Sequence, residues 1–386
     1  MYVFKTADTI ITKVGIASEI GEHLSQLKQH VQKALLLTQP ALQKSGAVEK
    51  VVASLNQAGV SVDVTTDVEP EPTLSNIETV YQATLNVTDY DVLIGLGGGS
   101  ILDTTKLLSV MKTNDMSLDE MLGSDQVKQP GIPTVLIPTT SGTGAEVTPN
   151  AIVTLPEKEL KIGVVSSYLL PNLVLIDAAL TTGLPKPITA ATGMDAFTHA
   201  LESYISNKAN PISDMFALEA IRLISANIET AYFNGGNIEA RERMLIGSMY
   251  GGMALTAAGT AAVHAMAYPL GGKYKIAHGV ANSMLLPHVT QFNMDAIETR
   301  LATVAEPMGI KKENQDEKEM AQAVVDRIVE LTKILEIPQD LSAYGVQDSA
   351  IESMAVAALD VKRLMDNNPK QLTKEDVKAI YGKLLA

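Results

Sequence analysis

Four residues in the second half of the sequence have the types and spacing of a metal site. Asp195 and His199 are four residues apart, so on a helix both side chains project from one face. His264 lies in a second, alanine-rich helical segment, and His278 opens a third. Cysteine is absent, so one carboxylate and three imidazoles would supply oxygen and nitrogen ligands without thiolate, which suits Fe²⁺ or Zn²⁺. The residue types do not choose between these metals.

The other histidines do not extend this set. His23 and His30 are interpreted as solvated residues near the N-terminus, and His288 ends a Leu-Pro-His segment ten residues after His278. The competing interpretation is that each imidazole is a satisfied core or capping residue, the commoner role for a single histidine. Three of the six histidines lie in this one stretch, and two of them are in alanine-rich helices. This clustering favours a metal site over four residues with unrelated structural roles.

A glycine-rich turn in the first half has the chemistry of a phosphate site. The turn consists of Gly97, Gly98, Gly99 and Ser100. It joins a buried apolar run to a helix predicted from Ile101, where glycines let a diphosphate approach backbone N–H groups and the helix N-terminus adds about half a positive charge. Asp103 can fix the loop through backbone hydrogen bonds. The spacing is not the common dinucleotide fingerprint, and a purely steric role for the glycines is the alternative.

A second polar loop follows the next predicted strand. Its hydroxyl-bearing residues are Thr139, Thr140, Ser141 and Thr143. Such a loop suits phosphate and ribose oxygens, although a simple capped loop has the same composition. Because the carboxyl ends of parallel strands open on one edge of a sheet, the two loops together predict a nucleotide site.

Two kinds of scaffold must position these residues. In the first half, short apolar runs alternate with amphipathic helical stretches, the pattern of a parallel sheet with helices on both faces. The predicted strands are 33–38, 62–66, 91–95, 134–138 and 173–177, with a hairpin from 152–154 and 160–165. Beyond the breaker cluster 183–187, apolar residues recur at three- and four-residue spacing. The predicted helices are 189–206, 213–233, 238–266, 280–291, 294–308, 317–335, 347–365 and 373–385.

These patterns predict an α/β domain at 1–182 and an all-helical domain at 183–386, and a cleft between two such domains is a preferred ligand site. The net charge of −14 disfavours nucleic acid and anionic membranes as partners. No export signal is visible, and the apolar stretch 251–272 is interrupted by threonine and His264. A buried core helix and a cytoplasmic location are therefore expected.

Four segments of the chain resemble the iron-containing (group III) alcohol dehydrogenases. They are 97–103 (GGGSILD), 138–148 (PTTSGTGAEVT), 195–206 (DAFTHALESYIS) and 264–288 (HAMAYPLGGKYKIAHGVANSMLLPH). The similarity is collinear over nearly the whole chain. It implies a dehydroquinate synthase-like fold, with an N-terminal domain that binds NAD(P), a C-terminal helical domain that binds metal and substrate, and a homodimer or higher homo-oligomer.

The resemblance also assigns roles to residues. It implies that a metal, Fe²⁺ or alternatively Zn²⁺, is held by Asp195, His199, His264 and His278. The cofactor positions it implies are Gln39, Gly97, Gly98, Gly99, Ser100, Asp103, Thr139, Thr140, Ser141, Thr143, Val153, Lys161 and Leu180. The metal would act as a Lewis acid on the oxygen of a small alcohol or aldehyde while hydride passes between the substrate carbon and nicotinamide C4.

The sequence departs from the family at several of its functional positions. Gln39 stands where a carboxylate usually accepts the adenosine ribose hydroxyls, so NAD is expected and NADP is allowed. Glu71 stands where the family often has asparagine, which alters a cofactor contact. Tyr268 replaces a histidine near nicotinamide and substrate, so it is either a proton relay or a packing residue.

The substrate wall differs as well. The resemblance places Asn150, Leu255 and Thr260 beside the substrate, and the segment before His264 carries smaller, more polar residues than is usual. We expect a substrate larger or more polar than ethanol. Two other interpretations are a lyase of the dehydroquinate synthase type and a non-catalytic nucleotide or metal sensor or filament protein. The lyase would need basic residues that this helical half lacks near its metal motifs.

Overall fold

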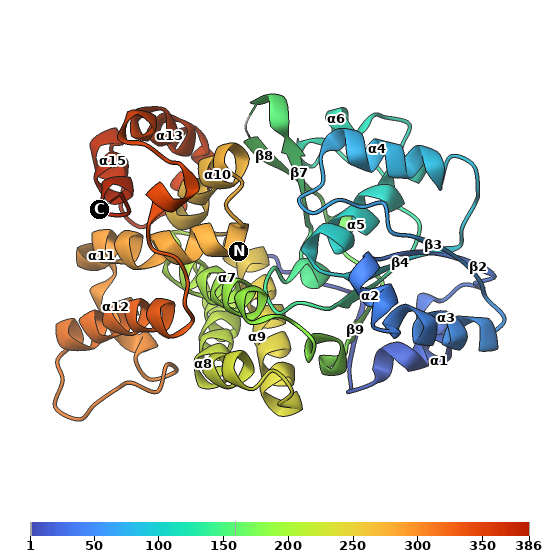
Figure 1. Cartoon of the computed structure of the whole chain (residues 1–386), viewed down its shortest axis with the longest axis horizontal. Helices are drawn as coiled ribbons and strands as arrows, with labels where there is room; N and C mark the ends of the chain where they lie inside the picture. The colour runs from blue at the N-terminus through green and yellow to red at the C-terminus, as the bar shows by residue number, and fades with distance from the viewer. Residues whose placement is uncertain (1, 159, 386) are drawn as a thin grey trace. The chain divides into compact units, whose positions relative to one another are not determined.

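The computed structural model describes residues 2–158 and 160–385 (Figure 1). The chain divides into two compact units. The α/β unit is Lys5–Gly183, and the helical unit runs from Leu184 onward and includes the N-terminal segment up to Phe4. The α/β architecture followed by helices confirms the predicted fold class.

The α/β unit is built on a six-stranded parallel sheet with the order β1-β9-β6-β4-β2-β3. Its strands are β1 (Thr9–Thr12), β2 (Lys33–Leu37), β3 (Ser61–Thr65), β4 (Val92–Gly97), β6 (Thr134–Pro138) and β9 (Leu173–Ile176). Five of the six were predicted from the apolar runs. The short edge strand β1 was missed, because its sequence TIIT shows no alternation long enough to distinguish it from a loop.

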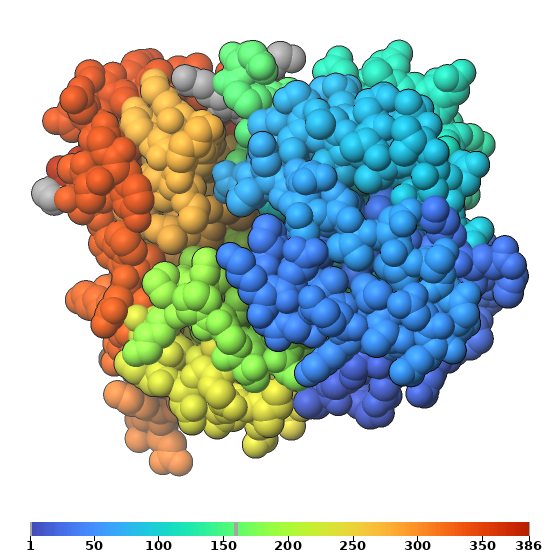
Figure 2. Space-filling model, turned by 45° about the vertical axis from the view of Figure 1, so that its right-hand side comes forward, coloured from blue at the N-terminus to red at the C-terminus, as the bar shows by residue number. Residues whose placement is uncertain are grey.

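The inner strands β2, β4, β6 and β9 are mostly apolar because both of their faces are covered. In β2, Ala34 and Leu36 pack on one face while Leu35 and Leu37 pack on the other. The unit's helices are α1 (Ile20–His23), α2 (Pro40–Lys44), α3 (Ala47–Gln57), α4 (Leu74–Ala83), α5 (Gly99–Thr113) and α6 (Leu118–Met121). α1 and α3 cover the first face, and α4, α5 and α6 cover the second. In the space-filling view, the N-terminal part of this unit, in blue, forms a continuous surface on the side that faces the viewer (Figure 2).

A second, smaller sheet with the order β5-β8-β7 lies in the same unit. It is formed by β5 (Gly123–Ser124), β7 (Asn150–Leu155) and β8 (Leu160–Val165). β7 and β8 pair antiparallel, which confirms the predicted hairpin, and Thr154 lies opposite Lys161 in its register. Directly opposed residues carry their side chains on the same face, so these two project together.

The helical unit contains nine α-helices in the described part of the chain. They are α7 (Lys186–Ile205), α8 (Pro211–Phe233), α9 (Ile238–Ala258), α10 (Ala262–Tyr274), α11 (His278–Val304), α12 (Glu317–Ile334), α13 (Asp348–Asp360), α14 (Lys362–Met365) and α15 (Lys374–Gly382). None of them combines the length and apolarity that a bilayer-spanning segment needs.

Three helix predictions were wrong in the helical unit, and one of them is the predicted helix 347–365, which is interrupted at Val361 between α13 and α14. The predicted helix 238–266 is two helices, because Gly259 has a φ of +74° and ends α9. A glycine just past the last helical residue is a common helix stop. Conversely, the predicted helices 280–291 and 294–308 form the single helix α11, since no breaker residue separates them.

Candidate metal centre and nucleotide site

Three helices of the helical unit bring the predicted ligand residues together. Asp195 and His199 lie one turn apart on α7, His264 lies in the first turn of α10, and His278 is the first residue of α11. One potential ligand atom from each residue lies within 4.8 Å of the other three. Asp195, His199 and His264 are buried, whereas the His278 side chain is 28% exposed. The site therefore opens toward solvent beside His278.

The carboxylate of Asp195 is the centre of this cluster. Its Oδ1 lies 3.9 Å from Nε2 of His199, 3.9 Å from Nε2 of His264 and 3.8 Å from Nε2 of His278. Burial acts to raise the pKa of Asp195, but the three histidines and a hydrogen bond from Asn282 outweigh it and hold that pKa below its usual range. Asp195 is therefore ionised at neutral pH, as a metal ligand must be.

A close approach of two helices lets His278 join the cluster. The residue after it is Gly279, and a Cβ built there would lie only 2.2 Å from the backbone oxygen of Ala191 on α7. Any larger residue would push the start of α11 away from α7. The glycine therefore determines how near His278 can come to Asp195.

Glu202 fixes the orientation of His264. It lies three residues after His199 on α7 and is 1% exposed. The His264 Nδ1–H donates to Glu202 Oε2 at 2.5 Å, and the Val263 N–H donates to Glu202 Oε1 at 2.6 Å. Because a carboxylate only accepts, this bond places the imidazole hydrogen on Nδ1 and directs the Nε2 lone pair toward Asp195. Metal-binding histidines generally have such a carboxylate behind them.

Asn282 contacts three of the four residues. Its Nδ2 donates to Asp195 Oδ1 at 2.7 Å and lies 3.2 Å from His264 Nε2 and 3.1 Å from His278 Nε2. Neither Glu202 nor Asn282 was predicted. The available signal was helical spacing, since Glu202 follows Asp195 by seven residues and Asn282 follows His278 by four.

The donor set fits a divalent first-row metal. Ligand atoms at ~2.1 Å from a tetrahedral ion lie ~3.4 Å apart, close to the separations between Asp195 and the histidines. The three histidine Nε2 atoms and one carboxylate oxygen form a ligand set without sulfur, which Fe²⁺ and Zn²⁺ both accept.

The predicted nucleotide loops lie at the carboxyl edge of the large sheet. The chain passes outward from β2 to β3 and then returns to β4 on the other side of β2, so the direction of the strand order reverses between β2 and β4. Ligands of open α/β sheets bind at such a reversal. The turn Gly97–Ser100 leaves β4 there, and α5 begins within it at Gly99, two residues before the predicted start.

Polar atoms without partners surround this turn. In the described residues, the hydroxyls of Thr38, Thr139 and Ser141 are buried and form no hydrogen bond. Thr38 follows β2 and the other two follow β6, the two strands that flank β4. Buried polar groups normally have partners, so these hydroxyls fit a site for a polar ligand such as a dinucleotide.

The second loop is held against α5. A Cβ at Gly99 would lie 2.7 Å from Cγ2 of Thr143, so only glycine allows the two loops to approach this closely. Asp103 accepts a hydrogen bond from the Ile152 N–H and pairs with Lys106 at 2.9 Å. Asp103 thus accepts a backbone hydrogen bond from β7, rather than from the glycine turn where the bond was expected.

The remaining predicted cofactor residues differ in their surroundings. Gln39 is half-buried at the start of α2, directly after β2, and Thr140 lies beside Gly98. Val153 is fully buried in the core under α5, and Leu180 packs partly buried against the opposite face of the sheet. Lys161 projects from β8 and pairs with Glu71.

Models of one protein family match both units of the chain. Residues 7–178 match the model of the iron-containing alcohol dehydrogenases, and residues 189–385 match the C-terminal domain of the same family. The chain belongs to the iron-containing alcohol dehydrogenase family. It is accordingly an oxidoreductase that acts on CH–OH groups, and this membership favours that interpretation over a lyase or a non-catalytic sensor.

Individual members of the family are similar over nearly their whole length. Long-chain-alcohol dehydrogenase 1 of Geobacillus thermodenitrificans is 41% identical over 352 residues, which cover 90% of this chain and 88% of that protein. A solved structure of a 1,3-propanediol oxidoreductase is 36% identical, with a TM-score of 0.95 and full coverage of both chains. A sulfoacetaldehyde reductase from Bifidobacterium kashiwanohense, solved in complex with NAD⁺, is 26% identical, with a TM-score of 0.89 over 100% of this chain and 99% of that one.

Tyr268 of this alcohol dehydrogenase lies close to His278, one of the four predicted ligands. Its ring centroid is 6.3 Å from that of His278. Burial raises the pKa of the phenol above its usual value, although the charge of Arg363 opposes the shift. Tyr268 therefore stays protonated at neutral pH and can donate a hydrogen bond.

The predicted substrate residues are divided between the two units. Leu255 and Thr260 flank Gly259 in the helical unit, and Asn367 donates to the Thr260 carbonyl at 2.8 Å. Asn150 begins β7 in the α/β unit, and its carbonyl accepts a hydrogen bond from Lys106.

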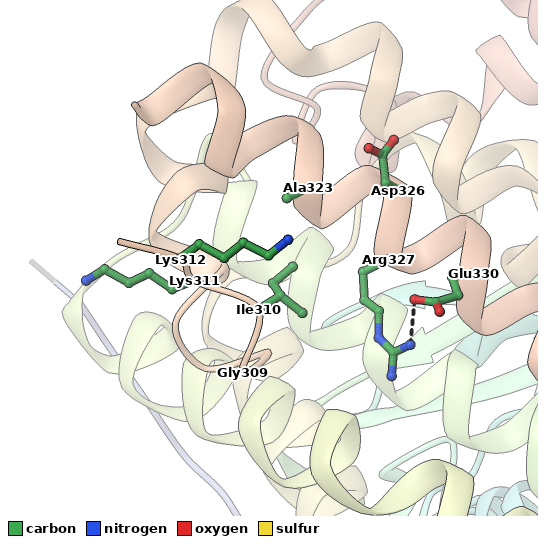
Figure 3. A pocket seen from close by; sticks show the side chains of 8 residues that line it. All are labelled: Gly309, Ile310, Lys311, Lys312, Ala323, Asp326, Arg327 and Glu330. Atoms are coloured by element: carbon green, nitrogen blue, oxygen red, sulfur yellow. Dashed lines mark hydrogen bonds and ion pairs between the residues drawn. The ribbon is translucent and has the colours of Figure 1, made fainter. Parts of the chain in front are cut away.

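A pocket of about 600 Å³ lies elsewhere in the helical unit, between the segment Gly309–Lys312 and α12 (Figure 3). Its lining contains none of the predicted site residues. Arg327 within it pairs with Glu330 at 2.7 Å and also with Glu229. Its charge is thereby satisfied, and we assign the pocket no role in the reaction.

Proposed function

We propose that Asp195, His199, His264 and His278 hold the catalytic divalent ion of this alcohol dehydrogenase. The observation that carries the proposal is the convergence of their four ligand atoms within 4.8 Å from three separate helices. Fe²⁺ is the expected ion and Zn²⁺ the alternative. Such an ion, when bound, supplies Lewis-acid polarisation of the substrate oxygen.

The protein residues around the ion have separate tasks in this proposal. Glu202 orients His264, and Asn282 orients Asp195, so the ligands are in place before an ion arrives. Tyr268 keeps its proton on Oη at neutral pH and donates a hydrogen bond to the substrate rather than accepting a proton from it.

We propose NAD as the cofactor, with NADP allowed. The three unpartnered hydroxyls and the glycine turn support a dinucleotide at the carboxyl edge of the sheet. The NAD⁺ complex of the sulfoacetaldehyde reductase supports the same choice. Gln39 carries no charge that would repel a 2′-phosphate. The nicotinamide supplies the hydride acceptor or donor.

The substrate we propose is an alcohol or aldehyde larger or more polar than ethanol. The relatives are named for long-chain alcohols, 1,3-propanediol and sulfoacetaldehyde, so family membership leaves the substrate open. The side chains of Ala257, Thr260 and Ala262 are small or polar, which supports a site with space for such a group. A homodimer and a cytoplasmic location are part of the same proposal.

The test is a set of assays on protein stripped of metal and then reloaded with Fe²⁺ or Zn²⁺. Oxidation of NADH and of NADPH is followed at 340 nm with short aldehydes, hydroxyaldehydes and sulfonated aldehydes. We expect activity only in the reloaded enzyme, and a higher kcat/KM for the larger or polar aldehydes than for acetaldehyde. Activity in stripped enzyme would contradict the metal proposal, and a preference for acetaldehyde would contradict the substrate proposal.

Two histidine variants complete this experiment. H264A removes a proposed ligand, so the purified variant is expected to retain less than about a tenth of the metal bound by the parent protein. H288A is the matched control, because His288 lies on α11 outside the cluster, and its metal content should not change. Equal metal loss in both variants would mean that the cluster is not the binding site.

A further inference from the structure

Glu71 lies in an unusual backbone conformation at the edge of the glycine turn. It stands between two prolines in the link from β3 to α4, and its φ of +51° is in the left-handed region that non-glycine residues rarely adopt. Contacts to three different segments hold it there. The Glu71 N–H donates to Ser100 Oγ at 3.0 Å, and the Glu71 carbonyl accepts from Thr154 Oγ1 at 3.0 Å. The third contact is an ion pair with Lys161.

This ion pair isolates a positive charge from solvent. Glu71 Oε1 lies 2.8 Å from Lys161 Nζ, and the lysine side chain is only 7% exposed while the glutamate side chain is 36% exposed. Thr154 and Lys161 are opposite each other in the hairpin, so both reach Glu71 from the same face. Because the ammonium is shielded from water, it attracts the carboxylate more strongly than an exposed ammonium would.

The pair borders the start of α5, where the diphosphate of a dinucleotide would lie. Ser100 is in the first turn of that helix, and its Oγ already accepts the Glu71 N–H. In the described part of the chain, the Ser100 hydroxyl hydrogen has no bonded acceptor, so it can donate to a phosphate oxygen. The other buried amine of this region, Lys106, already pairs with Asp103 and donates to carbonyls after β6.

We propose that Glu71 limits the affinity of this site for the cofactor diphosphate. Its carboxylate neutralises Lys161 and adds a negative charge beside the phosphates, which weakens binding and speeds release of the product dinucleotide. This inference rests on the proposed function, because it requires that the glycine turn binds NAD(H). It assigns to Glu71 an electrostatic effect beyond the contacts that its backbone makes in the turn.

The test compares the binding of ADP-ribose and NADH to the parent protein and to E71Q. The amide keeps the size and the backbone contacts of residue 71 and removes the charge. We expect roughly three- to tenfold lower Kd values for both ligands in E71Q, from one fewer negative charge near the diphosphate. K161M should raise both Kd values by a similar or larger factor. Calorimetry with ADP-ribose measures binding without turnover or metal.

Salt and a control variant identify the cause. As NaCl is raised from 50 to 500 mM, binding to E71Q should weaken more steeply than binding to the parent protein. The reason is that salt screens the additional attraction between Lys161 and the phosphates. E19Q is the matched control, because Glu19 pairs with Lys13 on the surface of the same unit and changes the net charge equally. Its Kd values should equal those of the parent protein.

The outcomes separate this inference from the proposed function. If the parent protein binds neither ADP-ribose nor NADH, the proposed cofactor site is wrong. If it binds both and E71Q binds them equally or more weakly, Glu71 only shapes the turn and the inference is overturned. In the second case a lower affinity in K161M still supports a role for Lys161 at the diphosphate.

Discussion

The contact between Glu202 and His264 determines how one predicted ligand faces the metal site. Both side chains are almost fully buried, and the 2.5 Å hydrogen bond from Nδ1 fixes the orientation of the imidazole ring. Glu202 also accepts the N–H of Val263 at the start of α10, where the positive end of the helix favours a carboxylate. One residue thus ties α7, which carries Asp195 and His199, to the helix that carries His264.

We predict that E202Q weakens metal binding without removing a ligand. The amide cannot supply the negative charge that Glu202 places behind His264, so the apparent Kd for Zn²⁺ or Co²⁺ should rise by about 10- to 100-fold. Competition with a chromophoric chelator measures the affinity, and the visible spectrum of the Co²⁺ form reports the ligand geometry. We expect a shifted or broadened Co²⁺ band in the variant.

The control for this prediction is another buried glutamate changed to glutamine. Glu146 is 2% exposed and lies in the α/β unit, so E146Q should keep the Co²⁺ spectrum and metal affinity of the parent protein. Circular dichroism checks that both variants fold. Unchanged metal affinity in a folded E202Q protein would mean that Glu202 acts only on the start of α10.

Among the elements, the loop between β6 and β7 is held by buried charge. Lys106 on α5 is 1% exposed, and its ammonium donates to the carbonyls of Ala145 and Asn150 and pairs with Asp103. Glu146 lies in the same loop with Oε1 buried and without a hydrogen bond. Burial raises the pKa of Glu146 to about 7, although the charge of Lys106 opposes the shift. The loop therefore contains a carboxyl group that resists ionisation.

This shift predicts that stability depends on pH through Glu146. The folded-state pKa of about 7 exceeds the ordinary value of 4.5, so between these values the folded state binds more protons and stability falls as pH rises. Glutamine does not ionise. E146Q should therefore unfold with a free energy about 1–3 kcal/mol higher than the parent protein at pH 8, and with little difference at pH 4.5.

Urea denaturation at the two pH values measures this difference. Glu157→Gln is the control, because Glu157 is exposed after β7. This substitution should change the free energy of unfolding only slightly, and by the same amount at pH 4.5 and pH 8. An E146Q effect that is the same at pH 4.5 and pH 8 would show that the pKa of Glu146 does not differ between the folded and unfolded states.

At the scale of the whole molecule, the two units carry separate halves of the chemistry. The proposed metal ligands all belong to the helical unit, and the glycine turn and its unpartnered hydroxyls all belong to the α/β unit. The proposed metal site joins α7 to the consecutive helices α10 and α11. The proposed nucleotide site joins the ends of three neighbouring strands of one sheet. Each ligand is therefore expected to stabilise a different set of elements.

Hydrogen exchange followed by mass spectrometry tests this division. Adding Zn²⁺ to stripped protein should slow exchange in α7, the first turns of α10 and the start of α11, by at least about tenfold, since binding suppresses local opening. Adding ADP-ribose should slow exchange in the glycine turn and the loop after β6 instead. Protection of the glycine turn by Zn²⁺, or the same Zn²⁺ protection in H264A, would contradict this assignment.

Local spacing in the sequence was sufficient to predict most of the strands and helices and the residue types of both sites. Asp195 and His199 share a helix face because a helix repeats every 3.6 residues, and the glycine turn follows a strand whose apolar run marks it as buried. The same local signal failed at Gly259, because a glycine that ends a helix and a glycine tolerated inside one look alike in the apolar pattern. Short-range order of this kind depends on neighbours in the chain, so the sequence displays it directly.

The tertiary structure alone decided which distant residues meet. The strand order, which puts Thr38 and Thr139 on either side of the glycine turn, depends on how the helices cross the sheet. The bond from His264 to Glu202 and the pair of Glu71 with Lys161 join residues far apart in sequence. No periodicity encodes such contacts, because they arise from the packing of whole elements. The sequence determined which chemical groups the protein has, and packing determined which of them act on one another.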